Sequence, residues 1–128
     1  MPDAVVVTHG RIVSEAMAAK EELAKQGIAL GIILLEVIKP YDECARNVTD
    51  LLPKGVGRIV FLEEEIRNGG FGSCLADMMT RMGALEGIKH RIVATDDSFV
   101  DRARSGQCIY AAAGVDRDAV ISAVKEML

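Results

Sequence analysis

The stretch RIVFLEEEIRNGGFGS, residues 58–73, decides the fold of this chain. It joins an apolar run, Arg58 to Leu62, through three glutamates and a glycine pair to a helical pattern that begins at Phe71. A strand that breaks at acidic and glycine residues and restarts as a helix is how α/β proteins build sites or interfaces at a sheet edge. The stretch therefore predicts a strand followed by a crossover helix.

The same alternation of strand and helix repeats along the chain. Helix ends are marked by glycines and prolines, by predicted N-caps at Asp42 and Asp116, and by Gly83 as a C-terminal cap. Phe71, Leu75, Met78 or Met79, and Met82 form the predicted inner stripe of the third helix. Apolar runs predict strands at 4–8, 28–38, 58–62 and 91–95, and helical spacing predicts helices at 12–26, 43–52, 70–82, 106–113 and from 117 onward.

Strands that are each followed by a helix predict a single α/β domain over residues 1–128. Parallel strands need crossover connections, and those crossovers are right-handed. We expect three layers, α/β/α, around a mostly parallel sheet of four or five strands with the core order 2-1-3-4. The apolar run at 28–38 is continuous rather than alternating, which predicts a strand covered on both faces.

Composition limits the partners. The chain has 128 residues, a net charge of −4 and a pI near 5.2, which argues against nucleic acid or an anionic membrane as the main partner. The sequence contains no apolar run long enough to cross a bilayer and no signal peptide pattern, so we expect a cytoplasmic protein. Cys44, Cys74 and Cys108 lack metal-ligand spacing and are expected to be reduced core thiols.

The acidic and glycine residues after the third strand are the candidates for a functional site. In an extended chain Glu63 and Glu65 share one side and Glu64 takes the other. His9 follows the first strand at the same predicted edge, so it is placed to face Glu64 or Glu65. Gly69 and Gly70 expose the first N–H groups of a helix, which suits either an anion or a close protein partner.

No complete set of catalytic groups accompanies these residues. Neither a dinucleotide fingerprint nor a phosphate-binding P-loop is present, no convincing nucleophile is found, and a plain polar loop with paired carboxylates remains the alternative. We therefore assign no catalytic, cofactor-binding or metal-binding residue. The candidate interface or anion site consists of residues at the predicted ends of the first and third strands: His9, Gly10, Glu64, Glu65, Arg67, Asn68, Gly69 and Gly70.

Two motifs in this order resemble the C-terminal domain of the transketolase-like thiamine diphosphate enzymes. The first is the turn Ile38-Lys39-Pro40-Tyr41-Asp42-Glu43, and the second is VFLEEE at 60–65 running into GGFGS at 69–73. The resemblance covers nearly the whole chain, and within the family it is strongest to 1-deoxy-D-xylulose-5-phosphate synthases. The segment at 95–106 lacks the prolines of the synthase loop, which weakens that narrower assignment.

The resemblance implies a part of an enzyme rather than a whole one. In this family thiamine diphosphate and Mg²⁺ bind between two other domains, so no cofactor is expected in this one. The expected function is a dimerisation and structural domain, or a regulatory one, or a split subunit of a transferase that condenses pyruvate with glyceraldehyde 3-phosphate for isoprenoid precursors. Two alternatives remain: a small-anion-binding regulatory module, and a split subunit of transketolase or a 2-oxoacid dehydrogenase.

The resemblance also implies partners. The expected assembly is a homodimer or an association with the cofactor-binding domains. Domains of this family normally carry an extra antiparallel strand before the first parallel one, and only Met1, Pro2 and Asp3 precede that strand here. We therefore expect an exposed sheet edge.

Overall fold

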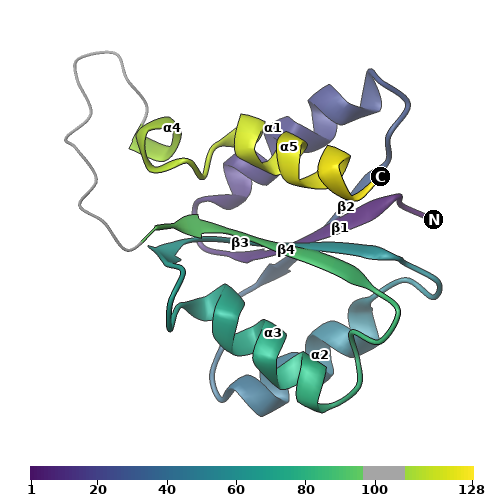
Figure 1. The fold of residues 1–128 in the computed structure, drawn as a ribbon, viewed down its shortest axis with the longest axis vertical. Coiled ribbons are helices and arrows are strands. Elements are labelled where there is room, and N and C mark those ends of the chain that lie inside the picture. Colours follow the sequence, from purple (N-terminus) through teal and green to yellow (C-terminus); the bar gives the residue numbers. More distant parts are fainter. Residues whose placement is uncertain (97–108) are drawn as a thin grey trace.

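The computed structural model describes residues 1–96 and 109–128 and shows three layers, with helices on both faces of one sheet (Figure 1). Strands and helices alternate along the chain up to β4, as the sequence predicted. The elements are β1 Ala4–His9, α1 Val13–Ala24, β2 Leu30–Leu35, α2 Tyr41–Leu51, β3 Arg58–Ile66, α3 Phe71–Arg81, β4 Lys89–Thr95, α4 Ile109–Ala113 and α5 Arg117–Met127.

The sheet has four strands in the order β2-β1-β3-β4, and every neighbouring pair is parallel. The predicted fold class and strand order are thus confirmed. The order reverses beside β1 because the first crossover, through α1, and the second, through α2, run over opposite faces of the sheet (Figure 1). The carboxyl ends of β1 and β3 consequently lie next to each other.

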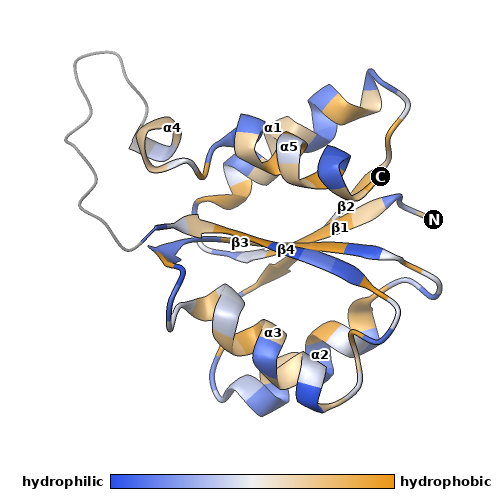
Figure 2. Ribbon diagram, viewed as in Figure 1, coloured by the Kyte–Doolittle hydropathy of each residue, from blue (hydrophilic) through white to orange (hydrophobic). Residues whose placement is uncertain are grey.

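Two apolar cores fill the space between the layers. Alternate residues of the central strands point to opposite faces, so Val6 and Val60 pack with α1 and α5 while Val7 and Phe61 pack with α2 and α3. Figure 2 shows the result: hydrophobic colour concentrates on the strands and inner helix faces, and hydrophilic colour lies on the outer faces. Both faces of the sheet centre are therefore closed to water.

β3 is longer than predicted. The sequence placed its end at Leu62, whereas the strand continues through the three glutamates to Ile66. The register with β4 shifts between Leu62 and Ile66, and the Arg67 N–H still donates to the Thr95 carbonyl at 2.8 Å. Pairing with β4 holds the acidic segment extended, although glutamate has a low strand propensity.

β2 is shorter than the predicted 28–38, and the expectation that it is covered on both faces is wrong. It is an outer strand of the sheet, and the Leu34 side chain is 51% exposed. A continuous apolar run is typical of a parallel strand that is buried on both faces, but here the run forms a strand at the edge of the sheet.

The predicted helix caps are partly correct. Asp116 caps α5, because its side chain accepts a hydrogen bond from the Ala119 N–H at 3.2 Å. Asp42 does not cap α2. That helix begins earlier, with Pro40 at the N-cap, and Asp42 instead forms an ion pair with Arg46 one turn later at 3.5 Å.

The inner stripe of α3 is confirmed at Phe71, Leu75 and Met79, all of which are buried. Met82 was also expected there and is instead 42% exposed. It lies at the C-cap, after the last regular turn, so it no longer follows the helical spacing. Gly83 follows with φ +74°, as expected for a C-terminal cap.

Two cysteines lie in the described part of the chain. Cys44 is buried, and burial raises the pKa of its thiol, whereas Cys74 is only half-buried. Cys108 and the segment at 97–108, including the start of the predicted helix at 106–113, lie outside the described residues. None of the helices described has the length and apolar character that a membrane-spanning helix needs.

Candidate functional site

The candidate site lies where β1 and β3 end side by side. Thr8 pairs with Leu62 in the parallel register, and the buried Thr8 hydroxyl donates to the Leu62 carbonyl at 2.8 Å. This bond ties the two strand ends together just before His9 and the three glutamates. The sheet thus brings segments 54 residues apart into one neighbourhood.

Glu63 is the most unusual group in this neighbourhood. Its side chain is 0% exposed, and its Oε2 accepts a hydrogen bond from the Gly72 N–H at the start of α3. Oε1 has no hydrogen-bond partner within the described residues. The pKa of Glu63 is raised to about 7, first by burial and then by the charge of Glu65, against the opposing effects of the Gly72 N–H and Arg67.

Two of the three glycines after the strand, Gly70 and Gly72, lie where neighbouring atoms leave little room for a side chain. A Cβ on Gly70 would lie closer than 3.0 Å to the Ile66 carbonyl oxygen and to Glu63 Oε1. A Cβ on Gly72 would lie 3.1 Å from Ile92 Cγ2. Of the three, Gly69 is the one with a positive φ, +79°, a backbone conformation that favours glycine. The motif therefore lets the helix N-terminus approach a buried carboxylate.

Of the two carboxylates that the sequence offered His9, Glu64 and Glu65, the structure places Glu65 beside it. His9 Nε2 lies 3.0 Å from Glu65 Oε1, with the His9 side chain 23% exposed and that of Glu65 44% exposed. The two atoms are close enough for an ion pair, but their approach does not meet hydrogen-bond geometry, which leaves Nε2 without such a bond in the described structure. The His9 ring also packs edge-to-face on Phe71, with ring centroids 4.6 Å apart.

Glu64 points to the other side of β3, as the alternation predicted. Its Oε1 lies 3.4 Å from Arg11 Nε, in an exposed pair. Tyr110 of α4 lies beside this pair: the pKa of its hydroxyl is raised by burial first and then by Glu64. Sequence reasoning named neither Arg11 nor Tyr110, because no spacing connects residues that only the sheet and the C-terminal helices bring together.

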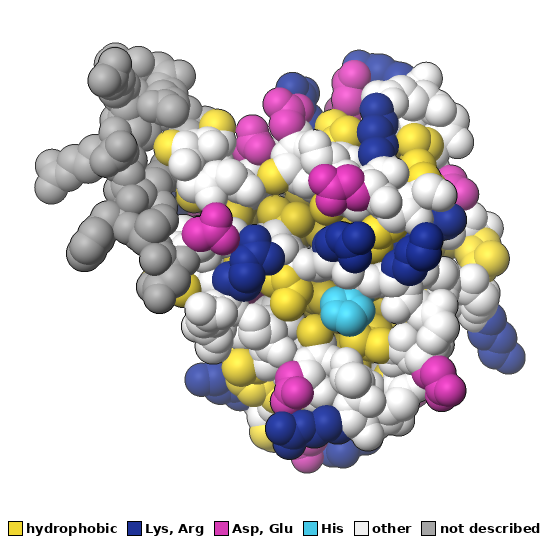
Figure 3. Space-filling model, viewed as in Figure 1, with side chains coloured by type: hydrophobic (Ala, Val, Ile, Leu, Met, Phe, Trp, Pro, Cys, Tyr) yellow, Lys and Arg dark blue, Asp and Glu magenta, His cyan; other side chains and the backbone are white. Residues whose placement is uncertain are grey.

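Arg67 turns away from the other candidates toward the β4 edge. Its guanidinium donates to the carbonyls of Ile92 and, at 3.5 Å, Ala94, and its Nε lies 3.4 Å from Asp96 Oδ1. A row of Lys and Arg side chains crosses the middle of the face shown in Figure 3, where Figure 1 places β4. Asn68 is exposed and has no side-chain contact of this kind among the described residues.

The arrangement is a packed, charge-paired junction between strand and helix. Gly72, in the first turn of α3, already donates to the Glu63 carboxylate, so part of the predicted anion-binding N-terminus is occupied by the chain itself. The Ser73 hydroxyl donates to the Arg67 carbonyl and is therefore engaged as well. Within the described residues, this geometry suits an ordered interface or loop better than a catalytic site.

Glu63 itself was missing from the predicted site. A signal for it was available, because Ile59, Phe61 and Glu63 alternate along β3 and so point to the same buried face. The predicted strand ended at Leu62, so the alternation of Ile59 and Phe61 did not extend to Glu63.

Comparison with known proteins agrees with this architecture. The family model described as "Transketolase, C-terminal domain" matches residues 1–120. A 1-deoxy-D-xylulose-5-phosphate synthase of Anaeromyxobacter sp. (strain K) is 32% identical over 131 residues, which cover 99% of this chain and 20% of the synthase. That of Syntrophotalea carbinolica is 28% identical over 98% of this chain and 19% of its own length.

A solved structure shares the fold. The protein described as "Split gene transketolase, inactive beta4 tetramer" superposes with a TM-score of 0.77 and 24% identity, over 98% of this chain and 39% of that one. The chain thus spans about a fifth of the length of the curated relatives cited here. The family match over 120 of 128 residues, the sheet order and the shared fold agree, and the chain belongs to the transketolase C-terminal domain family.

Proposed function

We propose that this chain is the structural and assembly domain of a thiamine diphosphate-dependent transferase resembling 1-deoxy-D-xylulose-5-phosphate synthase. In this proposal it carries no cofactor and no catalytic residue of its own, and it acts in the cytoplasm together with the domains that bind thiamine diphosphate and Mg²⁺. Its contribution is to hold those domains, or a second copy of itself, in place.

One observation carries this proposal: the chain matches whole synthases over only a fifth of their length. The site geometry adds support, because the charged side chains at the carboxyl ends of β1 and β3 contact groups of this same chain. His9 lies against Glu65, Glu64 lies against Arg11, and Glu63 accepts from the N-terminus of α3. Groups that are already paired suit a fixed surface better than a reaction that must move protons and charge.

Calorimetry tests the absence of a cofactor site. Thiamine diphosphate with Mg²⁺ is titrated into the purified chain, and the expected result is heat no greater than that of dilution. Saturable binding of the cofactor to these residues alone would contradict the proposal. A complete 1-deoxy-D-xylulose-5-phosphate synthase titrated in parallel shows that the assay detects binding.

Co-expression tests the assembly role. The structural neighbour is described as the product of a split gene, which favours the variant in which this chain is a separately encoded subunit. If adjacent reading frames encode the cofactor and pyrimidine domains, we expect their product to copurify with this chain. The complex should then condense pyruvate with glyceraldehyde 3-phosphate, whereas either chain alone should not. Condensation of a ketose and an aldose phosphate instead would favour a transketolase.

A further inference from the structure

The backbone groups of β4 alternate between the sheet and its outer edge. The Lys89 N–H donates to the Gly57 carbonyl and the Thr95 carbonyl accepts from the Arg67 N–H, so the odd-numbered residues of β4 face β3. Within the described residues β4 pairs with β3 alone. The backbone N–H and carbonyl groups that point outward therefore belong to the even-numbered residues, His90, Ile92 and Ala94.

Two arginines cover the outward carbonyls of β4 and leave the outward N–H groups as donors. Arg91 donates to the His90 carbonyl at 2.9 Å. Arg67 donates to the carbonyls of Ile92 and, at 3.5 Å, Ala94. A new strand needs acceptors as well as donors, so the covered carbonyls hinder strand addition at this edge. A row of N–H donors between guanidinium groups instead suits an anion.

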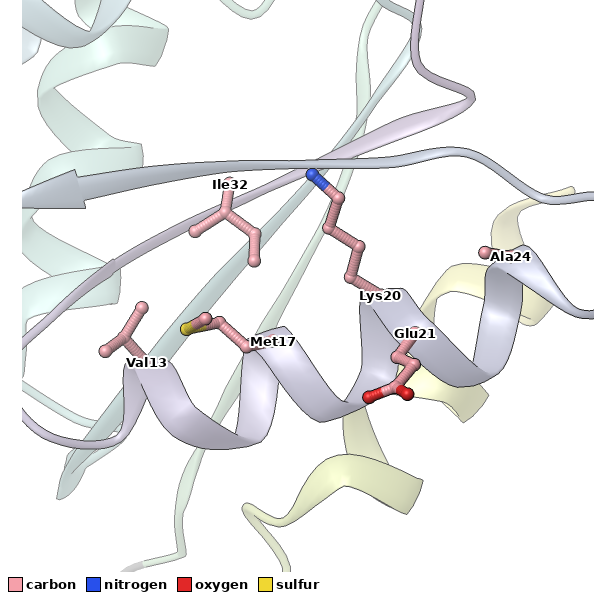
Figure 4. Close-up of a pocket in the computed structure, with 6 residues that line it drawn as sticks. All are labelled: Val13, Met17, Lys20, Glu21, Ala24 and Ile32. Carbon is pink, nitrogen blue, oxygen red and sulfur yellow. The ribbon is translucent and has the colours of Figure 1, made fainter.

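A groove between α1 and β2 shows no such preference for charge. It has a volume of about 520 Å³, and Figure 4 shows Val13 and Met17 of α1 facing Ile32 of β2 across it. Lys20 and Glu21 lie farther along the helix and carry opposite charges. The lining of this groove therefore selects neither an acidic nor a basic ligand.

The groove beside the β4 edge is different. It has a volume of about 270 Å³ and lies between β4 and α5. Apolar residues of both elements line it together with Arg67, Arg91, Ser122 and Glu126, so its basic residues outnumber its acidic one. Figure 3 shows the row of Lys and Arg side chains across this face, with hydrophobic surface next to it. The groove thus continues the positive edge of the strand.

Arg91 is the cation of this edge that is least engaged by the chain itself. Lys89 donates to the Met127 carbonyl at 3.4 Å and so holds the end of α5. Arg67 is bonded to two carbonyls of β4 and lies 3.4 Å from Asp96. Arg91 is exposed, and no carboxylate forms an ion pair with it within residues 1–96 and 109–128. An acidic chain thus keeps an arginine without an acid at this edge.

We propose that the outer edge of β4 and the groove beside it bind an acidic segment of a protein partner. Carboxylates of that segment accept from Arg91 and from the outward N–H groups. These groups lie roughly 7 Å apart along the strand and span roughly 13 Å, which matches successive acidic side chains better than one small anion. The net charge of −4 disfavours a long polyanion such as nucleic acid, whereas a short acidic segment meets only the local cations. This inference rests on the assembly role proposed above, in which the partner is the chain that carries the cofactor-binding domains.

Titration of the ¹⁵N-labelled chain with a hexaglutamate peptide at low salt, followed by NMR, tests the surface. The amide signals of His90, Ile92 and Ala94 should shift saturably, and added NaCl should weaken the binding. A hexaglutamine peptide should leave these signals unchanged. Absent shifts at millimolar peptide, or shifts centred on another surface, would overturn the proposal. So would an equal response to inorganic phosphate, or tighter binding of a single-stranded hexanucleotide, because either would assign the edge to a different ligand.

A pair of variants tests the role of Arg91. Arg91→Gln should weaken hexaglutamate binding about fivefold, whereas the control Arg46→Gln, at an exposed position on α2, should bind as the wild type does. Both variants should keep the circular dichroism of the wild type, because both side chains are exposed. Equal affinities of the two variants would refute the assigned role.

Copurification separates this inference from the proposed function. The cofactor-domain chain should copurify with the wild type and with Arg46→Gln, and less of it should copurify with Arg91→Gln. Undiminished copurification with Arg91→Gln would overturn the assigned surface and leave the proposed function standing. Saturable hexaglutamate binding at the β4 edge without copurification of the wild type would instead count against the proposed function.

Discussion

Replacing Glu63 by Gln should remove a pH dependence of stability from this protein. The carboxyl group is completely buried, and its Oε2 accepts from the Gly72 N–H. Its Oε1 and the Ile66 carbonyl oxygen face the same space beside Gly70, and within the described residues Oε1 has no donor there. A proton on Glu63, or the amide of Gln, supplies a donor to this space and removes a buried charge.

The sign and size of the effect follow from the pKa. Burial raises the pKa of Glu63 from 4.5 to about 7, so between these values the folded state keeps a proton that the unfolded chain has released. The contribution of Glu63 to the free energy of unfolding is therefore highest below pH 4.5, decreases as the pH rises toward 7, and is constant above that. At about 1.4 kcal/mol for each pH unit, the loss is about 3 kcal/mol.

Urea unfolding at pH 5, 6, 7 and 8 measures this loss. The informative quantity is the difference in unfolding free energy between the wild type and Glu63→Gln, because contributions that the two proteins share cancel in it. The variant should gain relative to the wild type as the pH rises, by about 2 to 3 kcal/mol over this range. Glu64→Gln, at an exposed position, serves as the control and should follow the wild type. A difference that stays constant from pH 5 to 8, or changes in the opposite direction, would refute the reasoning.

Three further substitutions test the local structure by urea unfolding at neutral pH. Gly70→Ala should lower the free energy of unfolding by about 2 kcal/mol or more, because its Cβ collides with the Ile66 carbonyl. The control Gly57→Ala has open space around its Cβ and should change little. Equal effects of the two substitutions would contradict the close approach at Gly70. Asp116→Ala should cost about 1 kcal/mol through loss of the α5 N-cap, and unchanged stability would show that the cap contributes nothing. Arg67→Ala should lower the free energy of unfolding by about 1 to 2 kcal/mol and speed amide hydrogen exchange along β4, because it removes the donor to two carbonyls at the sheet edge. Unaltered exchange would contradict that role of Arg67.

Much of the fold could be predicted because it depends on local patterns. Apolar runs that alternate with helical spacing require parallel strands with crossovers, and few sheet orders satisfy that connectivity. Phe71, Leu75 and Met79 of the α3 stripe and the Asp116 cap were predicted correctly for the same reason: each involves residues within a turn or two of one another. Predictions failed where a neighbouring strand decided the outcome, as at the end of β3.

The candidate site was predicted less completely. Alternation along an extended strand placed Glu64 and Glu65 on opposite sides, as the structure shows, but it left open which of the two faces His9. The direction of Arg67 could not be predicted, because the carbonyls that it covers lie on a strand some 25 residues farther along the chain. Whether this neighbourhood binds an anion or a partner stays a prediction.

The sequence alone therefore determined the alternation of strand and helix, the sheet order and the family motifs, because each depends on residue types at short and regular spacing. Only the tertiary structure decided what the junction at residues 58–73 does. Packing α3 against β3 buries Glu63 beneath Gly70 and Gly72, and pairing with β4 draws Arg67 to the sheet edge. Burial and pairing at long range set the charge state and direction of a side chain, and no local pattern encodes either.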